Sequence, residues 1–166
     1  MEIRFQQSPK EVSRMNTQEL REAFLAGNLM QQDMVQYVYS HYDRVIMGGA
    51  KPANKRVELV NHAELRSDYF LERREIGIIN VGGSGAVEAD GKSYSLNKLD
   101  CLYLGKGTKQ VSFESNSVND PAVYFLLSAP AHQQYSNQLM TKAQADTLSL
   151  GDNKTANKRI IYRYIH

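Results

Sequence analysis

The stretch over residues 76–113 decides the fold, and it opens with Ile76-Gly77-Ile78-Ile79-Asn80-Val81-Gly82-Gly83-Ser84-Gly85-Ala86-Val87-Glu88-Ala89-Asp90-Gly91-Lys92-Ser93-Tyr94-Ser95-Leu96. Seven of the chain's 11 glycines fall between Gly77 and Gly107, where they separate short apolar runs. The nearly continuous apolar run 76–81 predicts a strand buried on both faces. Residues 86–89 and 92–96 alternate around Asp90-Gly91, a pair typical of a hairpin turn because the turn needs positive φ at both positions. With the run 100–104, the pattern predicts a small antiparallel barrel or jelly roll.

Outside this stretch the chain shows more short strands and little helix. Asn16 or Thr17 can cap a helix over residues 16–25, in which Leu20 and Phe24 form one apolar face, and Gly27 is a natural stop. We predict an all-β jelly-roll β-sandwich with one or two short helices. The other expected elements are an arm or edge strand over 1–15, strands over 34–39, 44–47, 56–60, 122–127 and 159–165, a turn marked by Gly48-Gly49 and Lys51-Pro52, and a helical turn over 141–146.

Length and composition narrow the functional class. A chain of 166 residues is most simply one domain, and its net charge of +2 gives no indication of a nucleic-acid or membrane partner. The single Cys101 cannot form an internal disulfide, and its apolar strand favours an inert buried thiol over a reactive one. The chain starts without the apolar core of a signal peptide, and no run approaches the length of a membrane span, which predicts a cytoplasmic protein.

Few residues form a pattern that carries chemistry. The histidines, His41, His62, His132 and His166, show no His-x-His or His-x-x-x-His spacing, so we expect no metal site built wholly within this chain. Segments 83–85 and 105–108 resemble nucleotide-binding loops but lack a glycine that those motifs require. The cluster Glu72-Arg73-Arg74-Glu75 has two interpretations: a solvated or ion-paired strand end, or an arginine pair that binds a carboxylate.

Several segments resemble one enzyme family. The run Tyr69-Phe70-Leu71-Glu72-Arg73-Arg74-Glu75-Ile76-Gly77-Ile78-Ile79-Asn80-Val81-Gly82-Gly83-Ser84-Gly85 is similar to the N-terminal half of 5-keto-4-deoxyuronate isomerases, also called 4-deoxy-L-threo-5-hexosulose-uronate ketol-isomerases. Segments 38–44, 102–107, 128–132 and 150–153 agree in the same order, so the resemblance covers nearly the whole chain. It implies a cupin-type jelly roll over residues 1–166, the first half of a bicupin.

The resemblance also implies an activity and a cofactor. The intact enzyme would convert 5-dehydro-4-deoxy-D-glucuronate, a sugar acid, into 3-deoxy-D-glycero-2,5-hexodiulosonate in pectin degradation, with zinc polarising the carbonyl oxygen. The family's ligands, a His-x-His, a Glu and a His, belong to the second half, so no metal ligand or catalytic residue is assigned to this chain. We therefore expect the chain alone to be inactive. Arg73, Arg74 and Lys106 are candidates for binding the substrate carboxylate.

Oligomerisation and an alternative function complete the expectations. The resemblance implies a homo-oligomer, hexameric in the family. The last apolar run reaches His166 without a polar tail, so the chain looks cut. We expect the isolated chain to self-associate through residues 160–165 or through surfaces that the intact enzyme uses. The alternative is a metal-free cupin domain that binds a sugar or organic acid as a sensor.

Overall fold

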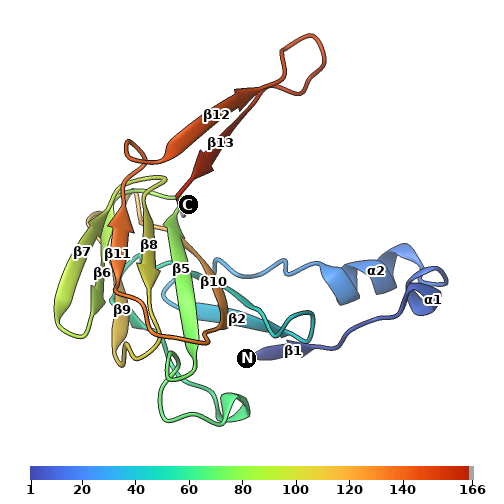
Figure 1. Ribbon diagram of the computed structural model, residues 1–166, viewed down its shortest axis with the longest axis horizontal. Helices are drawn as coiled ribbons and strands as arrows, with labels where there is room; N and C mark the ends of the chain where they lie inside the picture. The colour runs from blue at the N-terminus through green and yellow to red at the C-terminus, as the bar shows by residue number, and fades with distance from the viewer. Residues whose placement is uncertain (165–166) are drawn as a thin grey trace.

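A computed structural model describes residues 1–164 as a β-sandwich with two projecting segments (Figure 1). The larger sheet contains, in spatial order, β1 (Glu2–Arg4), β2 (Val35–Ser40), β3 (Ile46–Ala50), β10 (Tyr124–Pro130), β5 (Arg74–Asn80), β8 (Cys101–Leu104) and β11 (Gln138–Met140). The smaller sheet contains β4 (Val57–Glu58), β9 (Val111–Ser115), β6 (Gly85–Ala89) and β7 (Lys92–Leu96). A separate hairpin consists of β12 (Asp146–Leu150) and β13 (Arg159–Arg163). The predicted all-β jelly-roll sandwich with short helices is confirmed.

The core lies between the two sheets. Phe113 of β9 and Tyr124 of β10 are fully buried, and their ring centroids lie 5.3 Å apart across the gap. The Tyr124 hydroxyl donates to the backbone oxygen of Glu114 at 2.9 Å, so a buried phenol is satisfied by the opposite sheet. The other large, fully buried apolar side chains come from both sheets and from the loop before β5: Ile46, Leu71, Ile76, Ile78, Val87, Leu96, Leu102, Leu104 and Leu126.

The central strand β5 is buried on one face only, which corrects the prediction of burial on both. Ile76 and Ile78 are fully buried, whereas Gly77 and Ile79 are half-buried and Val81, just beyond the strand, is 39% exposed. The reason is architectural, because each antiparallel sheet of a two-layer sandwich packs one face on the core and leaves the other open. Apolar residues on both faces of β5 therefore mean that its open face is apolar as well.

The hairpin predicted at Asp90-Gly91 is confirmed. Asp90 and Gly91 have φ values of 48° and 80°, and Ala89 pairs with Lys92 in the antiparallel register of β6 and β7. The Asp90 carboxylate also accepts the backbone N–H of Gln110 at 2.8 Å. This hydrogen bond connects the turn to the residue just before the neighbouring strand β9.

The turn predicted at Gly48-Gly49 and Lys51-Pro52 is wrong in its first part, because both glycines lie inside β3, whereas the chain does bend after Pro52, over residues 53–55. A Cβ atom on Gly48 would lie 2.7 Å from the carbonyl oxygen of Gln36, and one on Gly49 would lie 2.5 Å from that of Leu29. These glycines therefore serve close backbone approach rather than a bend. The bend between β2 and β3 comes earlier in the chain, at residues 43 and 44, which both have positive φ.

The helix predicted over 16–25 is confirmed as α2 (Thr17–Phe24). Asn16 accepts from the Glu19 N–H at 3.0 Å, and the Glu19 carboxylate accepts from the Asn16 N–H at 2.7 Å. The C-cap is Leu25, before the expected stop at Gly27. An unpredicted α1 (Pro9–Val12) precedes it, and neither helix has a buried residue. The two helices form an arm that extends away from the sandwich (Figure 1).

The termini follow the predictions in outline. The expected N-terminal edge strand is present as β1, which pairs parallel with β2. The predicted helical turn at Thr141 is present, with the Ala145 N–H donating to the Thr141 carbonyl at 3.2 Å. The expected last strand corresponds to β13, and residues 165 and 166 lie outside the described part. No helix between residues 1 and 164 combines the length and apolar character needed to cross a membrane.

The Asn80 side chain joins four segments at the end of β5. Fully buried, it donates to the carbonyl oxygens of Gly83 at 2.7 Å and Leu96 at 3.0 Å. Its Oδ1 accepts the N–H groups of Gly82 at 3.1 Å and Val123 at 3.3 Å. One amide therefore satisfies both lone-pair directions and both N–H groups, which is the full capacity of the side chain.

Replacing Asn80 by alanine should destabilise the fold by about 2–4 kcal/mol, because two buried and two partly buried backbone groups would lose this partner. Urea unfolding of the variant measures the change. The control is Asn116→Ala, whose exposed amide makes one side-chain bond to Ser84 and should stay within about 0.5 kcal/mol of the parent chain. Equal losses in the two variants would contradict the role given to Asn80.

Candidate functional site

The described residues do not assemble a metal centre. Between residues 1 and 164, no three His, Cys, Asp or Glu side chains come close enough together to hold an ion. His41 stacks on Phe5 with ring centroids 4.7 Å apart, and His62 packs edge-on against Tyr37 at 5.1 Å. His132 lies near Tyr135 in a third region. These residues therefore do not fit the zinc ion that the family resemblance implies.

Of the sequence-predicted arginines, Arg74 is buried in the sandwich. Its Nε donates to Ser128 Oγ at 3.1 Å, and its Nη2 donates to the carbonyl oxygens of Arg44 at 2.7 Å and Ser128 at 2.9 Å. The guanidinium also lies over the Tyr39 ring, 5.9 Å from its centroid. Burial lowers the pKa of this group. Its donors hold β5, β10 and the loop before β3 together, which is a structural use of the cation.

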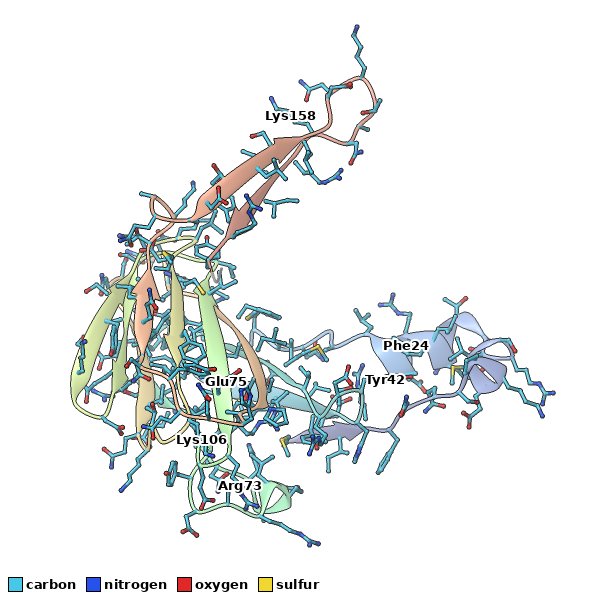
Figure 2. The ribbon with its side chains drawn as sticks, viewed as in Figure 1. Phe24, Tyr42, Arg73, Glu75, Lys106 and Lys158 are labelled. Atoms are coloured by element: carbon cyan, nitrogen blue, oxygen red, sulfur yellow. The ribbon has the colours of Figure 1, made fainter. Side chains whose placement is uncertain are left out.

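Arg73 and Lys106 lie on loops at one end of the sandwich (Figure 2). The Arg73 side chain is 62% exposed, lies 3.8 Å from the Glu72 carboxylate and donates to the Arg66 carbonyl oxygen. Lys106 lies in the loop after β8. The Gly107 N–H of this loop donates a hydrogen bond to the Leu71 carbonyl oxygen at 2.8 Å, which joins it to the loop that carries Arg73. Because Arg73 is exposed and Arg74 buried, the two do not form an arginine pair.

Alanine variants of Arg73, Arg74 and Lys106 should differ in their free energy of unfolding. Arg74→Ala should lower the free energy of unfolding by about 3 kcal/mol, because its buried partners would be left unsatisfied. Arg73→Ala and Lys106→Ala should each stay within about 0.5 kcal/mol, since both side chains reach solvent. Denaturant unfolding of all three variants makes the comparison, and a neutral Arg74→Ala would contradict its structural assignment.

A cavity of about 360 Å³ opens on the outer face of the larger sheet. Its floor comes from β5, β8 and β11, and its walls come from the loop before β11 and from the residue after β13. The lining residues are Glu75, Cys101, Tyr103, Tyr135, Ser136, Gln138, Met140 and Tyr164. We missed this site in the sequence, because Glu75 and Tyr103 are 28 positions apart and meet only through the pairing of β5 with β8.

A carboxylate and a phenol form the polar centre of this cavity. The Tyr103 hydroxyl donates to Glu75 Oε2 at 2.8 Å. Burial, and then the hydrogen bond to Glu75, raise the pKa of Tyr103 well above its usual range. Burial also raises the pKa of the Cys101 thiol. Glu75 supplies the one carboxylate of the described lining, which includes no basic side chain. Around it lie three further hydroxyl groups, of Tyr135, Ser136 and Tyr164, and the Gln138 amide.

The wall of the cavity is positioned by Gly105 and Asn137. A Cβ atom on Gly105 would lie 2.1 Å from the Tyr135 carbonyl oxygen, so only glycine lets the wall approach β8 this closely. Asn137 Oδ1 accepts the Gly105 N–H at 2.8 Å and the Thr108 hydroxyl at 3.3 Å. The cavity is therefore built on fixed backbone. Its chemistry suits a small polyhydroxylated ligand that donates hydrogen bonds to a carboxylate.

Comparison with known proteins gives one consistent family. The model of the KduI/IolB family matches residues 24–166. A protein from Formosa agariphila is 47% identical over 164 residues, which cover 99% of this chain and 59% of that protein. One from Shouchella clausii is 43% identical over 166 residues, which cover 100% of this chain and 60% of that protein. Both relatives are named 4-deoxy-L-threo-5-hexosulose-uronate ketol-isomerase.

The chain spans about 60% of the length of these curated relatives. Among solved structures, that of an IolB-like protein from Salmonella typhimurium matches with a TM-score of 0.56. The match covers 73% of this chain and 44% of that one at 15% sequence identity. It supports the fold alone.

Proposed function

Because this chain belongs to the KduI/IolB family, we propose that it is the N-terminal half of a zinc-dependent ketol-isomerase. The substrate would be 5-dehydro-4-deoxy-D-glucuronate and the product 3-deoxy-D-glycero-2,5-hexodiulosonate, in the degradation of pectin. The observation that carries the proposal is the identity of 43–47% to proteins named as such ketol-isomerases, over nearly every residue of the chain.

In this proposal the chain is the scaffold of the enzyme. Ketol isomerisation moves a proton between adjacent carbons through an enediol, whose oxygen needs an electrophile. The described residues bring no three metal donors together, and the buried Arg74 is occupied by backbone carbonyls. We therefore assign the zinc ligands to the part of the relatives' length that this chain does not span. Arg73 and Lys106 remain candidates for contacting the substrate carboxylate from a neighbouring surface.

The purified, untagged chain should hold no stoichiometric zinc and should not turn over the 5-keto uronate. The physical reason is the absence of a clustered donor set among residues 1–164. Elemental analysis and a product assay against a protein-free blank provide the two measurements. The full-length Shouchella clausii relative, prepared in parallel, serves as the positive control. One tightly held zinc per chain together with turnover would refute this division of roles.

A second candidate function is a binding module for a small sugar, favoured by the cavity around Glu75 and Tyr103. A sensor for a sugar or an organic acid was the alternative drawn from the sequence. Since Glu75 supplies the one charge of the described lining and no basic side chain lines it, the cavity favours a neutral sugar over an organic acid. Tyrosine rings and hydroxyl groups suit the faces and edges of a sugar ring.

Titration calorimetry with D-glucose, D-glucuronate and D-glucosamine tests whether the cavity prefers a neutral sugar. The three ligands have the same pyranose ring and differ in charge. Glucuronate should bind about fivefold more weakly than glucose, from roughly 1 kcal/mol of repulsion by Glu75. Glu75→Gln should narrow that difference, and Glu88→Gln on the other sheet should preserve it. Tighter binding of glucuronate than of glucose would contradict the charge argument, and no binding of any of the three would exclude a hexose site.

A further inference from the structure

Three buried side-chain atoms have no hydrogen-bond partner among residues 1–164: the Tyr37 hydroxyl oxygen, Nε2 of His62 and the Ser112 hydroxyl oxygen. A buried polar group without a partner costs free energy, so each of these atoms needs an explanation. Tyr37 and His62 come from different segments of the chain, yet both line the same cavity. Two of the three unpartnered atoms therefore belong to one place in the fold.

This cavity has a volume of about 380 Å³ and lies at the edge of the larger sheet, where β1 begins beside β2. Its walls come from the loop after α2, from β2 and from His62, which follows β4. Part of the lining is aliphatic, with side chains that include Met1, Leu29, Met34 and Val35. A hollow of this size, with an apolar wall and a few polar atoms, has the form of a small-molecule site.

Ring packing fixes the two unpartnered atoms at this cavity. Tyr37 is 5% exposed, and its ring centroid lies 5.4 Å from that of Phe70 and 5.1 Å from that of His62. His62 precedes the short 3-10 turn at residues 63–65, but its side chain makes no capping hydrogen bond to that turn. The fold therefore holds both polar atoms in position without using either of them.

Both groups can donate a hydrogen bond at neutral pH. Burial raises the pKa of Tyr37 above its usual range, and the nearby Val60 N–H offsets only part of this rise, so the hydroxyl keeps its proton. Burial, and then the positive charge of the Met1 amino group, lower the pKa of His62, whereas Glu64 acts in the opposite direction. The imidazole is therefore neutral, with one proton that Nε2 can carry.

The charges at the cavity favour an anionic ligand. Glu2 supplies the one carboxylate of the described lining, and Arg4 Nε lies 2.7 Å from its Oε1. At His62 the positive charge of the Met1 amino group outweighs the negative charge of Glu64. A ligand carboxylate would thus meet hydrogen-bond donors and a positive field, a combination that strengthens hydrogen bonds.

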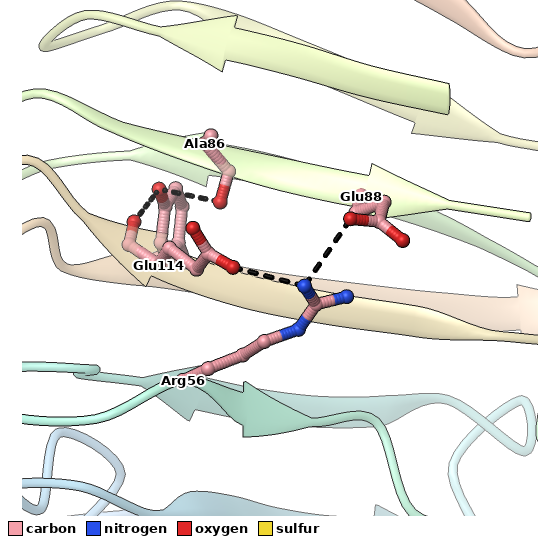
Figure 3. Close-up of polar contacts among 5 residues, drawn as sticks. Arg56, Ala86, Glu88 and Glu114 are labelled. Atoms are coloured by element: carbon pink, nitrogen blue, oxygen red, sulfur yellow. Dashed lines mark hydrogen bonds and ion pairs between the residues drawn. The ribbon is translucent and has the colours of Figure 1, made fainter. Parts of the chain in front are cut away.

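The third unpartnered atom has different surroundings. Ser112 lines a smaller cavity of about 220 Å³ on the other sheet, together with Arg56 and Glu88. There Arg56 Nη1 lies 3.2 Å from Glu88 Oε2 and 3.0 Å from Glu114 Oε1 (Figure 3). Carboxylates of the chain itself already neutralise this arginine. Ser112 therefore offers a control for the loss of an unpartnered hydroxyl at a different place.

We propose that the cavity beside β1 and β2 binds a small aliphatic monocarboxylate, whose oxygens accept hydrogen bonds from the Tyr37 hydroxyl and from His62 Nε2. The Gln31 amide can add a third N–H, since its oxygen already accepts from Gln36 Nε2 at 3.2 Å. The hydrocarbon part of the ligand lies against the aliphatic lining. This site shares no lining residue with the Glu75 cavity and is independent of the isomerase assignment.

A titration of the untagged chain at pH 7, followed by two-dimensional NMR, tests the proposal with hexanoate, 1-hexanol and hexylamine. The three probes have the same hydrocarbon chain and differ in the head group. Hexanoate should shift the amide signals of Tyr37 and His62 to saturation, with a dissociation constant of the order of 1 mM. Hexanol should bind about tenfold more weakly, because its hydrogen bonds lack the assistance of a charge, and hexylamine more weakly still.

Tyr37→Phe removes only the unpartnered hydroxyl, and it should weaken hexanoate binding about tenfold. It should not lower the melting temperature, because no hydrogen bond of the described chain is lost. The matched control, Ser112→Ala, removes the other unpartnered hydroxyl and should bind hexanoate like the parent chain.

The proposal fails if hexanoate gives no saturable shift at Tyr37 and His62, or if hexanol or hexylamine binds as tightly as hexanoate. It also fails if Tyr37→Phe and Ser112→Ala bind hexanoate equally well. A clearly lower melting temperature of Tyr37→Phe would show that the fold uses this hydroxyl, which would remove the basis of the proposal.

Discussion

Burial of only one face of the larger sheet is the constraint from which the other features follow. Ile76, Ile78 and Leu126 point into the gap between the sheets and are essentially inaccessible to solvent. Residues of the opposite parity on the same strands, such as Ile79 and Leu127, point outward. Because side chains alternate along a strand, one choice of register fixes both surfaces at once. The sandwich core and the open outer face that holds the cavity are consequences of that choice.

Two buried polar side chains hold the ends of the central strand. Arg74 lies at its start and Asn80 at its end, and both bond to backbone groups of distant segments. Unsatisfied backbone groups are costly where water is excluded, so these side chains determine where β5 can begin and end. The same bonds withdraw Arg74 from any contact with a ligand. Recognition on this side of the molecule therefore depends on the cavity and on exposed residues.

The functional picture combines a catalytic family with a chain whose described residues hold no metal donors in a cluster. The Glu75–Tyr103 cavity carries one negative charge, which is the wrong sign for the carboxylate of a sugar acid. On the same face of the sheet, Ile79 and Leu127 add partly exposed apolar surface.

The features that depend on neighbouring residues could be predicted from the sequence. The Asp90-Gly91 turn and the Asn16–Glu19 cap depend on residues within three positions of one another, so the printed order was sufficient to predict them. Gly48-Gly49 also has the sequence pattern of a turn, but both glycines lie in strand β3. They are required there because the backbone oxygens of Gln36 and Leu29 leave no room for a Cβ atom. The tertiary structure likewise decided that Arg74 is buried against Ser128 and that Glu75 accepts a hydrogen bond from Tyr103. Their partners come from strands that are distant in the chain, and only the register of the folded sheet brings them within hydrogen-bonding distance.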